Sequence, residues 1–492
     1  MPFVPNHQEG CGRFFIMQST FPKELFGLTT FVHPEQMEMD LNKLYSSNRL
    51  GYNNSGFSDP RTVFQRDFDR IIFSSAFRRL QNKTQVFPLP GSVFVHNRLT
   101  HSLEVASVGR SLGSLAGEHI AATYAGQLTP ESVEFYRYSL SSVIGAACLC
   151  HDIGNPAFGH SGEDAIASYF KDNASGLQSY FTDTQWADFI NFEGNANAIR
   201  VLTQQQNGKS GGAFNLTVST LSAIAKYPCE ASGKMKGGSI HRKKFGFFEG
   251  ETAQFQEMAS KTSMILESES PLIYKRHPFV WLVEAADDIC YNIIDLEDAH
   301  RLAIIEHAEC RDLLVYLIEC IGLENMPKLK DHLLTIQNKN EKISFLRAKS
   351  INSLIMKSIA IYKRDFEKFV AGDYDRSLFD TIGLDCPAIE QIIQVSISRI
   401  YNHRSVVEIE NAGYNVMSEL LSHLIPPVLA TAGEITNAQK KAAKLIPEQF
   451  QYNSGSNYEK AMGVLDFVSG MTDNYATSLY RKIKGIDIGM TL

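Results

Sequence analysis

The feature that most constrains this chain is a histidine next to an aspartate, placed where an apolar helix is expected to end. The run VIGAACLC leads into His151 and Asp152, and Gly154-Asn155-Pro156 follows them. The run has the length and periodicity of a buried helix, and Gly-Asn-Pro is a helix stop. A neutral imidazole beside a carboxylate suits a divalent cation such as Mg, Mn, Fe or Co. Because a lone pair of this kind is more often a helix-terminal hydrogen bond, a metal site needs further ligands from elsewhere in the chain.

Two other segments can supply those ligands. HNRLTHSLEVA places His101 at the start of an apolar helix, and WLVEAADDICYNIIDLEDA is an apolar helix with several acidic residues. Buried carboxylates are costly unless they are paired or bound to metal. Asp287, Tyr291 and Asp295 share one helical stripe, which favours Asp287 over the adjacent Asp288 as a ligand. We therefore predict a site with two imidazoles and two carboxylates from three helices: His101, His151, Asp152 and Asp287.

The order H…HD…D resembles that of the HD-domain metal phosphohydrolases. Five longer segments are similar to the deoxyguanosinetriphosphate triphosphohydrolases, a branch of the deoxynucleotide triphosphohydrolases: FRRLQNKTQVF, HNRLTHSLEV, HDIGNPAFGHSGE, FEGNANAIR and VEAADDICYNIIDLEDA. They occur in the order found in that family, and the resemblance runs from about Arg61 to the end of the chain. It implies a mainly α fold, with an HD-domain helical core and an additional helical C-terminal part.

Three parts of the chain are expected. Residues 1–36 are rich in Phe, Pro and His without clear periodicity, so they are predicted to be a loose N-terminal extension or to precede the natural start. Residues 37–300 are predicted to form the metal phosphohydrolase core, and residues 301–492 a helical C-terminal part packed on it. Strand-like alternation is scarce, which agrees with a mainly α fold.

Two local features are also predicted. Ser161 is the expected N-cap of the helix that follows the metal pair, with Asp164 at the capping-box position. A turn is expected at Ile425-Pro426-Pro427, between segments with amphipathic helical patterning.

His160 and Glu163 lie just past the metal pair, three residues apart on one helix face. Cleavage at the α-phosphate of a nucleotide expels the nucleoside 5′ oxygen, a poor leaving group that needs a proton. We predict that His160 is the general acid or base and that Glu163 orients it. The alternative is that His160 only caps its helix and that Glu163 is solvated.

Substrate-binding residues are suggested partly by spacing and partly by the family resemblance. Arg98 lies three residues before His101, so it can reach a metal-bound phosphate. Lys226 and Lys244 resemble the family's phosphate-contacting lysines, although the HRKK cluster that includes Lys243 and Lys244 could equally be a solvated charge run. The resemblance further implies four contacts to the nucleoside: Gln85 to the sugar and base, Asn195 within its family motif, Tyr291 to C2′ and Asp295 to the 3′-OH.

Composition argues against several other classes of protein. The net charge of −7 argues against general coating of nucleic acid. No apolar run reaches the roughly 18–20 residues of a membrane span, and the N-terminus lacks the layout of a signal peptide. The eight cysteines are scattered without a CxxC pair, which favours reduced thiols and a cytoplasmic location.

The sequence therefore predicts a metal-dependent enzyme that cleaves a deoxynucleoside triphosphate, foremost dGTP, to deoxynucleoside and inorganic triphosphate. The first alternative is an HD-type nucleotidase or alarmone hydrolase. The second is a non-catalytic sensor of nucleotides or single-stranded DNA, which the intact set of candidate catalytic residues argues against. The resemblance also implies a homo-oligomer, with a hexamer as one form, and regulation by a dNTP or by single-stranded DNA; no membrane partner is expected.

Overall fold

The computed structural model describes residues 38–50, 60–87, 95–204, 214–431, 433 and 435–488. Glu38–Leu492 form one compact unit. The predicted extension, residues 1–36, lies outside the described residues. The predicted division of the remainder at residue 300 stays a prediction.

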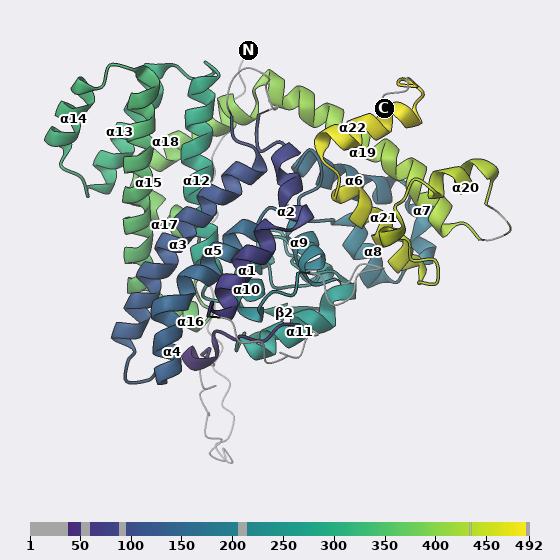
Figure 1. Cartoon of the computed structure of the whole chain (residues 1–492), viewed down its shortest axis with the longest axis horizontal. Helices are drawn as coiled ribbons and strands as arrows, with labels where there is room; N and C mark the ends of the chain where they lie inside the picture. The colour runs from purple at the N-terminus through teal and green to yellow at the C-terminus, as the bar shows by residue number, and fades with distance from the viewer. Residues whose placement is uncertain are drawn as a thin grey trace, which may run out of the picture. The chain divides into compact units, whose positions relative to one another are not determined.

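Helices dominate the part of the chain that the structure describes (Figure 1). Its strands are β1 (Leu266–Glu269) and β2 (Leu272–Tyr274), an antiparallel pair in which Glu269 lies opposite Leu272. The predicted mainly α fold is therefore confirmed. None of the described helices combines the length and the apolar content needed to cross a bilayer.

The helices before the hairpin are α1 (Val63–Ile72), α2 (Ser75–Arg79), α3 (Arg98–Thr123), α4 (Pro130–Glu134), α5 (Leu140–Cys150), α6 (His160–Asp172), α7 (Ala174–Leu177), α8 (Asp183–Ile190), α9 (Gly194–Thr203), α10 (Val218–Ile224) and α11 (Thr252–Lys261). Those after it are α12 (Val280–Arg301), α13 (His307–Ile321), α14 (Met326–Thr335), α15 (Lys339–Arg364), α16 (Phe366–Val370), α17 (Leu378–Gly383), α18 (Pro387–Val395), α19 (Arg404–Leu429), α20 (Asn437–Ala443), α21 (Asn457–Ser469) and α22 (Asp473–Ile483).

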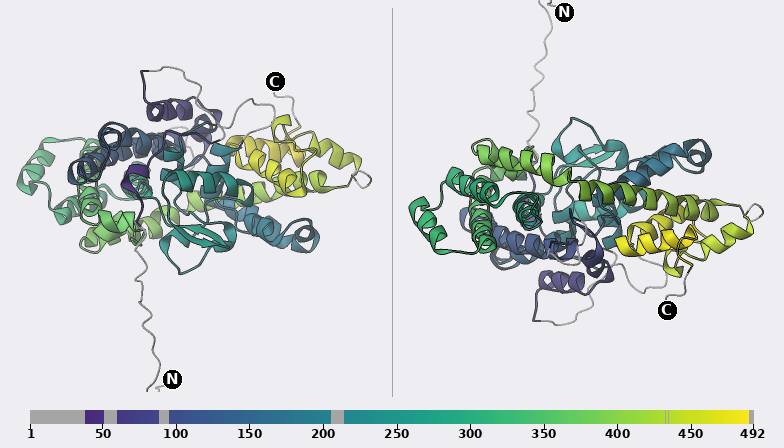
Figure 2. Two further views of the ribbon diagram at one scale, coloured as in Figure 1. Left: turned by 90° about the horizontal axis from the view of Figure 1, so that it is seen from below. Right: turned by 90° about the horizontal axis from the view of Figure 1, so that it is seen from above.

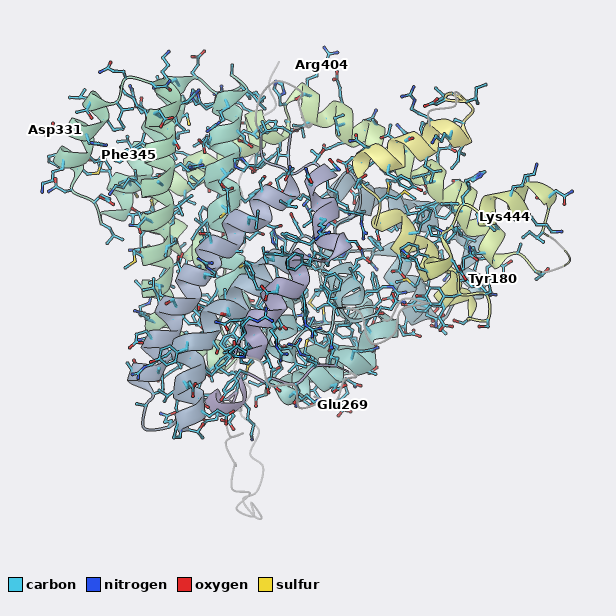
Figure 3. The ribbon with its side chains drawn as sticks, in the orientation of Figure 1. Tyr180, Glu269, Asp331, Phe345, Arg404 and Lys444 are labelled. Atoms are coloured by element: carbon cyan, nitrogen blue, oxygen red, sulfur yellow. The ribbon has the colours of Figure 1, made fainter. Side chains whose placement is uncertain are left out.

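Two hydrophobic cores organise these helices. One surrounds α3, α5 and α12 and extends to α13 and α15, and the other lies among α6, α8, α19 and α21. The green helices α13–α15 lie at one end of this unit and α20 lies at the other, with α21 and α22 between them (Figures 1 and 2). Asp331 of α14 and Lys444, just after α20, mark these ends in Figure 3.

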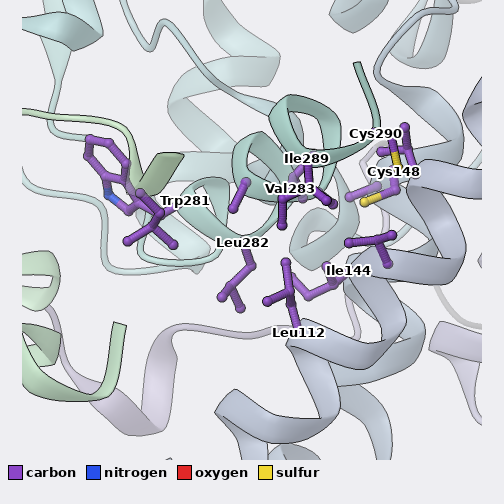
Figure 4. Close-up of a cluster of buried hydrophobic side chains, with 14 of the residues drawn as sticks. Leu112, Ile144, Cys148, Trp281, Leu282, Val283, Ile289 and Cys290 are labelled. Carbon is purple, nitrogen blue, oxygen red and sulfur yellow. The ribbon is translucent and has the colours of Figure 1, made fainter. Parts of the chain in front are cut away.

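The apolar run before the metal pair forms a buried helix, as predicted. Residues 143–150 are all buried in α5, which ends at Cys150, directly before His151. Glycines let α3 approach it closely, because a Cβ on Gly109 would collide with the sulfur of Cys148. Figure 4 shows Cys148 among the buried side chains of all three central helices, together with Leu112, Ile144, Ile289 and Cys290.

Helix termini place three of the four candidate ligands and the candidate acid. A capping box between Asn97 and Thr100 starts α3, so His101 lies in its first turn. The predicted cap at Ser161 is wrong, because the N-cap of α6 is Gly159, two residues earlier; Gly159 has φ 58° and the helix begins at His160 without a side-chain cap. Left-handed backbone at Phe158 and Gly159 turns the chain there, and a Cβ on Gly159 would lie 2.7 Å from Arg98 Nη2.

The predicted turn at Ile425-Pro426-Pro427 is also wrong. Helix α19 continues through both prolines to Leu429. Proline already has a helical φ, and near a helix end only a few backbone hydrogen bonds are lost. Burial of Leu424, Ile425 and Leu429 in the second core holds this last stretch helical.

Candidate active site

A cavity of about 680 Å³ opens at the end of α5, between α3, α6, α12 and the segment that leads into α19. Most of the residues predicted for the site line it: Gln85, Arg98, His151, Asp152, His160, Glu163, Asn195, Lys226, Lys244, Asp287 and Tyr291. Two predicted residues do not line it. His101 is buried behind Asp287, and Asp295 is buried behind Tyr401.

The four predicted metal ligands meet at the floor of this cavity. His101 Nε2 lies 3.1 Å from Asp287 Oδ1, and His151 Nε2 lies 3.5 Å from the same oxygen. The ligand atoms of His101, His151 and Asp152 all lie within 4.8 Å of one another. Asp287, rather than Asp288, faces both imidazoles. The fold therefore brings the four side chains together, while their binding of a metal stays a prediction.

Two donor atoms at this floor have the character of ligands. His151 Nδ1 lies 2.6 Å from the Cys148 carbonyl, which can only accept, so Nδ1 carries the proton and Nε2 keeps its lone pair. Among the described residues, buried His151 Nε2 has no hydrogen-bond partner, and buried Asp152 Oδ2 makes an ion pair with Arg98 but no hydrogen bond. Buried polar atoms are rarely left without partners unless an ion or water completes them. The donor set therefore fits a divalent cation.

Both carboxylates are held in the anionic form. Burial would raise the pKa of Asp152, but Arg98, whose Nη1 lies 2.9 Å from Oδ2, and the His151 imidazole lower it overall. Burial likewise opposes ionisation of Asp287, yet His151, His101 and Lys226 hold its pKa well below the ordinary value. Carboxylates that are already anionic can bind a cation without first losing a proton.

Four cationic side chains line the cavity, and three of them, Arg98, Lys226 and Lys244, are already paired with a carboxylate. Arg98 pairs with Asp152. Lys226 Nζ lies 3.3 Å from Glu284 Oε1, and the negative charge of Glu284 outweighs burial and raises the pKa of Lys226. These ion pairs keep the cations charged and positioned at the cavity surface.

The third cation is Lys244, which lies on the opposite side of the cavity. Its Nζ donates to Glu193 Oε1 at 2.8 Å and lies 4.0 Å from Glu163 Oε2. The two carboxylates outweigh burial and raise the pKa of Lys244. Lys243, its neighbour, also lines the cavity and is exposed.

His160 faces the cavity at the first position of α6. Desolvation by the cavity walls, then the charges of Lys244 and Arg98, lowers its pKa, so the imidazole is neutral at pH 7. Glu163 is buried one turn later, accepts from the Gly194 N–H at 2.8 Å, and has its pKa raised by burial and by Glu193. Among the described residues no hydrogen bond or ion pair joins His160 to Glu163, so the orienting role of Glu163 stays a prediction.

The predicted sugar-contacting residues lie beside a tyrosine that sequence reasoning missed. Tyr401 ends a π-helical segment, Ser396–Tyr401, and its ring stacks on Tyr291 with centroids 5.4 Å apart. Its hydroxyl donates to Asp295 Oδ2 at 3.0 Å. The Asp295 carboxylate therefore has an internal partner. Nothing local in the sequence marked Tyr401, because its contacts lie more than 100 residues away along the chain.

The remaining predicted contacts are both placed at the cavity. Gln85 Oε1 is buried and has no hydrogen-bond partner among the described residues. Asn195 Nδ2 donates to Glu193 Oε1 at 2.8 Å, the oxygen that also accepts from Lys244. Glu193 was also missed, although it belongs to the segment FEGNANAIR that carried the family resemblance.

Comparison with known proteins finds relatives that cover almost the whole chain. Residues 387–482 match the model of a phosphohydrolase-associated domain. A protein of Synechocystis sp. is 36% identical over 92% of this chain and 100% of its own length. A relative in Pseudomonas aeruginosa is 34% identical over 91% of this chain and 99% of its own length. A relative in Listeria monocytogenes is 32% identical over 89% of this chain and 97% of its own length. All three are described as deoxyguanosinetriphosphate triphosphohydrolase-like proteins.

Proposed function

This chain belongs to the deoxyguanosinetriphosphate triphosphohydrolase family, and from that premise we propose the reaction that its cavity carries out. It is a hydrolase of deoxynucleoside triphosphates, with dGTP as the preferred substrate. The bond between the α-phosphorus and the nucleoside 5′ oxygen breaks, and water supplies the oxygen and the protons. The products are deoxyguanosine and inorganic triphosphate.

The observation that carries the proposal is the meeting of two imidazoles and two carboxylates at the floor of a cavity with cationic walls. His101, His151, Asp152 and Asp287 would hold a divalent cation, for which Mg, Mn, Fe and Co are the candidates. Such a cation, when bound, lowers the pKa of water and neutralises charge on phosphorus. The buried His151 Nε2, which has no hydrogen-bond partner among the described residues, supports this assignment.

The cations of the cavity would bind the triphosphate. Arg98 is fixed by Asp152 at the floor, so we assign it to the α-phosphate. Lys226 and Lys244 lie on other walls and would contact the outer phosphates. Charge-assisted hydrogen bonds of this kind are the strong ones, and they orient the phosphorus for attack.

His160 would move the proton. Its neutral imidazole can accept a proton as water attacks the α-phosphorus, and the resulting imidazolium can donate to the departing 5′ oxygen. Glu163 would hold His160 in position, as proposed from the sequence. Proton balance is then complete: the 5′ oxygen leaves as a hydroxyl, and the triphosphate keeps the oxygen from water.

The tyrosine pair would discriminate between sugars. The ring of Tyr291, one turn from Asp287, would pack against C2′, where a hydroxyl would clash and find no partner. Tyr401 supports that ring by stacking on it. We propose that Asp295 acts on the 3′-OH through the hydroxyl of Tyr401, and that Gln85 and Asn195 contact the nucleoside.

A product analysis tests the proposal. Purified protein is incubated with Mn²⁺ or Mg²⁺ and each dNTP and rNTP in turn, and the products are resolved by ion-exchange chromatography. The expected products are deoxyguanosine and triphosphate. Release of monophosphate or pyrophosphate would instead support the nucleotidase or alarmone hydrolase alternative, and no turnover of any nucleotide would support the sensor.

From the family resemblance we also propose a cytoplasmic homo-oligomer, with a hexamer as one form, and regulation by a dNTP or by single-stranded DNA. Residues 37–300 would form the catalytic core and residues 301–492 its helical C-terminal part. Analytical ultracentrifugation with and without dNTP or oligonucleotide tests the assembly and its response. A monomer under all these conditions would contradict the oligomer.

A further inference from the structure

A residue of the last helix reaches the turn that precedes His160. Asp473 is the first residue of α22, and its side chain is buried. Its Oδ1 accepts from the Phe158 N–H at 3.0 Å, and its Oδ2 accepts from the Thr84 N–H at 2.8 Å. Phe158 lies two residues before His160, and Thr84 directly precedes Gln85. One carboxylate therefore holds the backbone of two segments that line the large cavity.

The backbone of Phe158 is strained and needs such support. Its φ of 62° lies in the left-handed region, which a bulky side chain rarely adopts. A conformation of this kind persists only where the surrounding structure holds it. Positive φ angles at Phe158 and Gly159 turn the chain so that α6 begins at His160, which lines the cavity. If the hold on Phe158 were lost, the turn could relax and His160 would move.

The side chain of Phe158 is held from a second direction. Its ring packs at the edge of the second core, against α19. A Cβ on Gly413 of α19 would lie 2.3 Å from Phe158 Cγ, so only a glycine there admits the ring. Helices α19 and α22 pack against each other (Figure 1). The contact of Gly413 with the ring and that of Asp473 with the backbone therefore come from one packed pair of helices.

The other hydrogen bond of Asp473 leads to the start of α3. Thr84 pairs with Asn97 in an isolated antiparallel bridge. Asn97 is the N-cap of α3, whose first turn carries the proposed ligand His101. Asp473 thus links the turn before His160 to the element that carries a proposed metal ligand. The distance between the candidate acid and the metal site depends on this link.

Both oxygens of the Asp473 carboxylate are used, which explains the residue type. A carboxylate offers one acceptor oxygen to each of the two N–H groups. An asparagine would offer a single oxygen, and its amide NH2 would face the other N–H. An alanine would remove both acceptors, and a buried N–H that loses its acceptor is unfavourable.

We propose that Asp473 is a positioning residue for His160. It holds the left-handed turn at Phe158 and Gly159 in a fixed place relative to the start of α3, and it does so without touching substrate or metal. No described residue of α22 lines the large cavity, so the role is an indirect one. The inference rests on the proposed function, because it takes His160 as the group that moves the proton.

Steady-state kinetics of the whole chain with dGTP and Mn²⁺ tests this role. Misplacement of a catalytic group by about 1 Å can cost about 10²-fold in rate, so Asp473→Ala is expected to lower kcat by about 10- to 100-fold. KM is expected to change much less, because Lys226 and Lys244 are held by other carboxylates. Asp473→Asn is expected to lie between Asp473→Ala and the wild type. Asn474→Ala, an exposed neighbour in the same turn, is the control and is expected to match the wild type.

A double-mutant cycle separates positioning from a general loss of stability. If Asp473 acts through His160, Asp473→Ala is expected to lower kcat little further when His160 is already alanine. Circular dichroism and Mn content establish that each variant is folded. Should Asp473→Ala fail to fold, Asp473→Asn carries the same cycle. An equal loss of kcat in both backgrounds, or an unchanged kcat in Asp473→Ala, would overturn the proposal.

Hydrogen–deuterium exchange gives a measurement that needs no turnover. Peptides that contain Phe158 are expected to exchange faster in Asp473→Ala than in the wild type, and peptides of α5 are expected to exchange equally in both. Unchanged exchange at Phe158 would also overturn the proposal. A wild-type protein that does not hydrolyse dGTP would contradict the proposed function itself, and faster exchange at Phe158 would then still show that Asp473 holds this turn.

Discussion

The two sides of the large cavity differ in how their polar groups are satisfied. On the helix side, His101, His151, Asp152 and Asp287 come from the ends and faces of α3, α5 and α12, and two of their buried atoms have no hydrogen-bond partner among the described residues. The other side is made of Glu193, Asn195, Lys244 and Tyr401, and we call it the loop side because Glu193 and Lys244 lie between helices. Each of these four side chains already has a partner.

This difference indicates a division of labour. The helix side is chemically incomplete, as expected where a cation must be bound. The loop side is complete without a ligand, so a substrate there has to exchange one partner for another. We therefore expect substitutions on the helix side to abolish the chemistry and those on the loop side to change affinity and selectivity.

The largest effect is expected from Asp287→Ala. A metal contributes several kcal/mol to catalysis, and each 1.4 kcal/mol is a factor of ten, so turnover is expected to fall by about 10³-fold or more. Metal content is measured by mass spectrometry alongside the rate. Asp288→Asn is the matched control and is expected to retain the metal. Loss of metal in the control but not in Asp287→Ala would reassign the ligand.

His160→Ala is expected to follow, with turnover lower by about 10²–10⁴-fold. Metal content and dGTP binding are expected to stay normal, since His160 is not among the proposed ligands. Because the neutral imidazole is the reactive form, activity is expected to rise with pH through the pKa of His160. That pKa is lowered, so the acid limb of kcat/KM is expected below the ordinary histidine value of about 6.5.

If His160→Ala turns over dGTP at nearly the wild-type rate, His160 has no catalytic role and serves only as the first residue of α6. An acid limb that persists in the variant would assign the titration to another group. Either result would mean that another residue transfers the proton to the leaving 5′ oxygen. The proposed contrast between the helix side and the loop side would then be weaker.

On the loop side, Lys244→Ala is expected to raise KM by about tenfold or more, which is the worth of one charged hydrogen bond. Steady-state kinetics with dGTP measures it, and kcat is expected to change less than KM. Lys243→Ala is the neighbouring control and is expected to have the smaller effect, since Lys243 is exposed and Lys244 is held by Glu193. Equal effects of the two substitutions on KM would show that Lys243 and Lys244 act only through their combined positive charge, and not through a specific contact of Lys244.

Tyr291→Ala is expected to reduce discrimination between dGTP and GTP. An unpaired buried hydroxyl costs about 1–3 kcal/mol, so the ratio of kcat/KM values is expected to fall by about 5- to 150-fold. Competition between the two nucleotides measures the ratio directly. If the wild-type enzyme hydrolyses both equally well, the proposed role of Tyr291 is wrong.

The smallest effect on turnover is expected from Tyr401→Phe. It removes the hydroxyl that donates to Asp295, and a buried carboxyl without its partner is expected to lower the free energy of unfolding by about 1–3 kcal/mol. Urea denaturation measures this change. A larger change in sugar selectivity here than in Tyr291→Ala would make Tyr401 the principal sugar-discriminating residue.

The helix side could be predicted from the sequence because its residues lie on long apolar helices with regular spacing. Asp287 was preferred over Asp288 by the periodicity of one helix, and in the structure Asp287 faces both imidazoles. The α6 cap failed because the left-handed backbone at Phe158 gives no signal in sequence. The helix through Pro426 was missed because burial of neighbouring apolar side chains outweighs local propensity.

The loop side could be predicted only in part. Lys244 and Asn195 came from the family resemblance, but their shared partner Glu193 did not. Tyr401 meets Asp295 across 106 positions of the chain, and no local pattern encodes such a contact. Its hydrogen bond also changes what Asp295 can do, since the carboxylate predicted to face the sugar is already bonded to a tyrosine.

The close approach of α3 and α5 has a consequence for how this site can evolve. Gly109 leaves room for Cys148, and the carbonyl of Cys148 is the acceptor that fixes the His151 ring. Eight residues separate Gly109 from His101, which is about 12 Å along a helix. A single added methyl group at Gly109 would therefore press on the residue that orients His151, while His101 on the same helix stays anchored by its capping box. Selection for the orientation of His151 is therefore expected to act on Gly109 too, although Gly109 is not itself a proposed ligand.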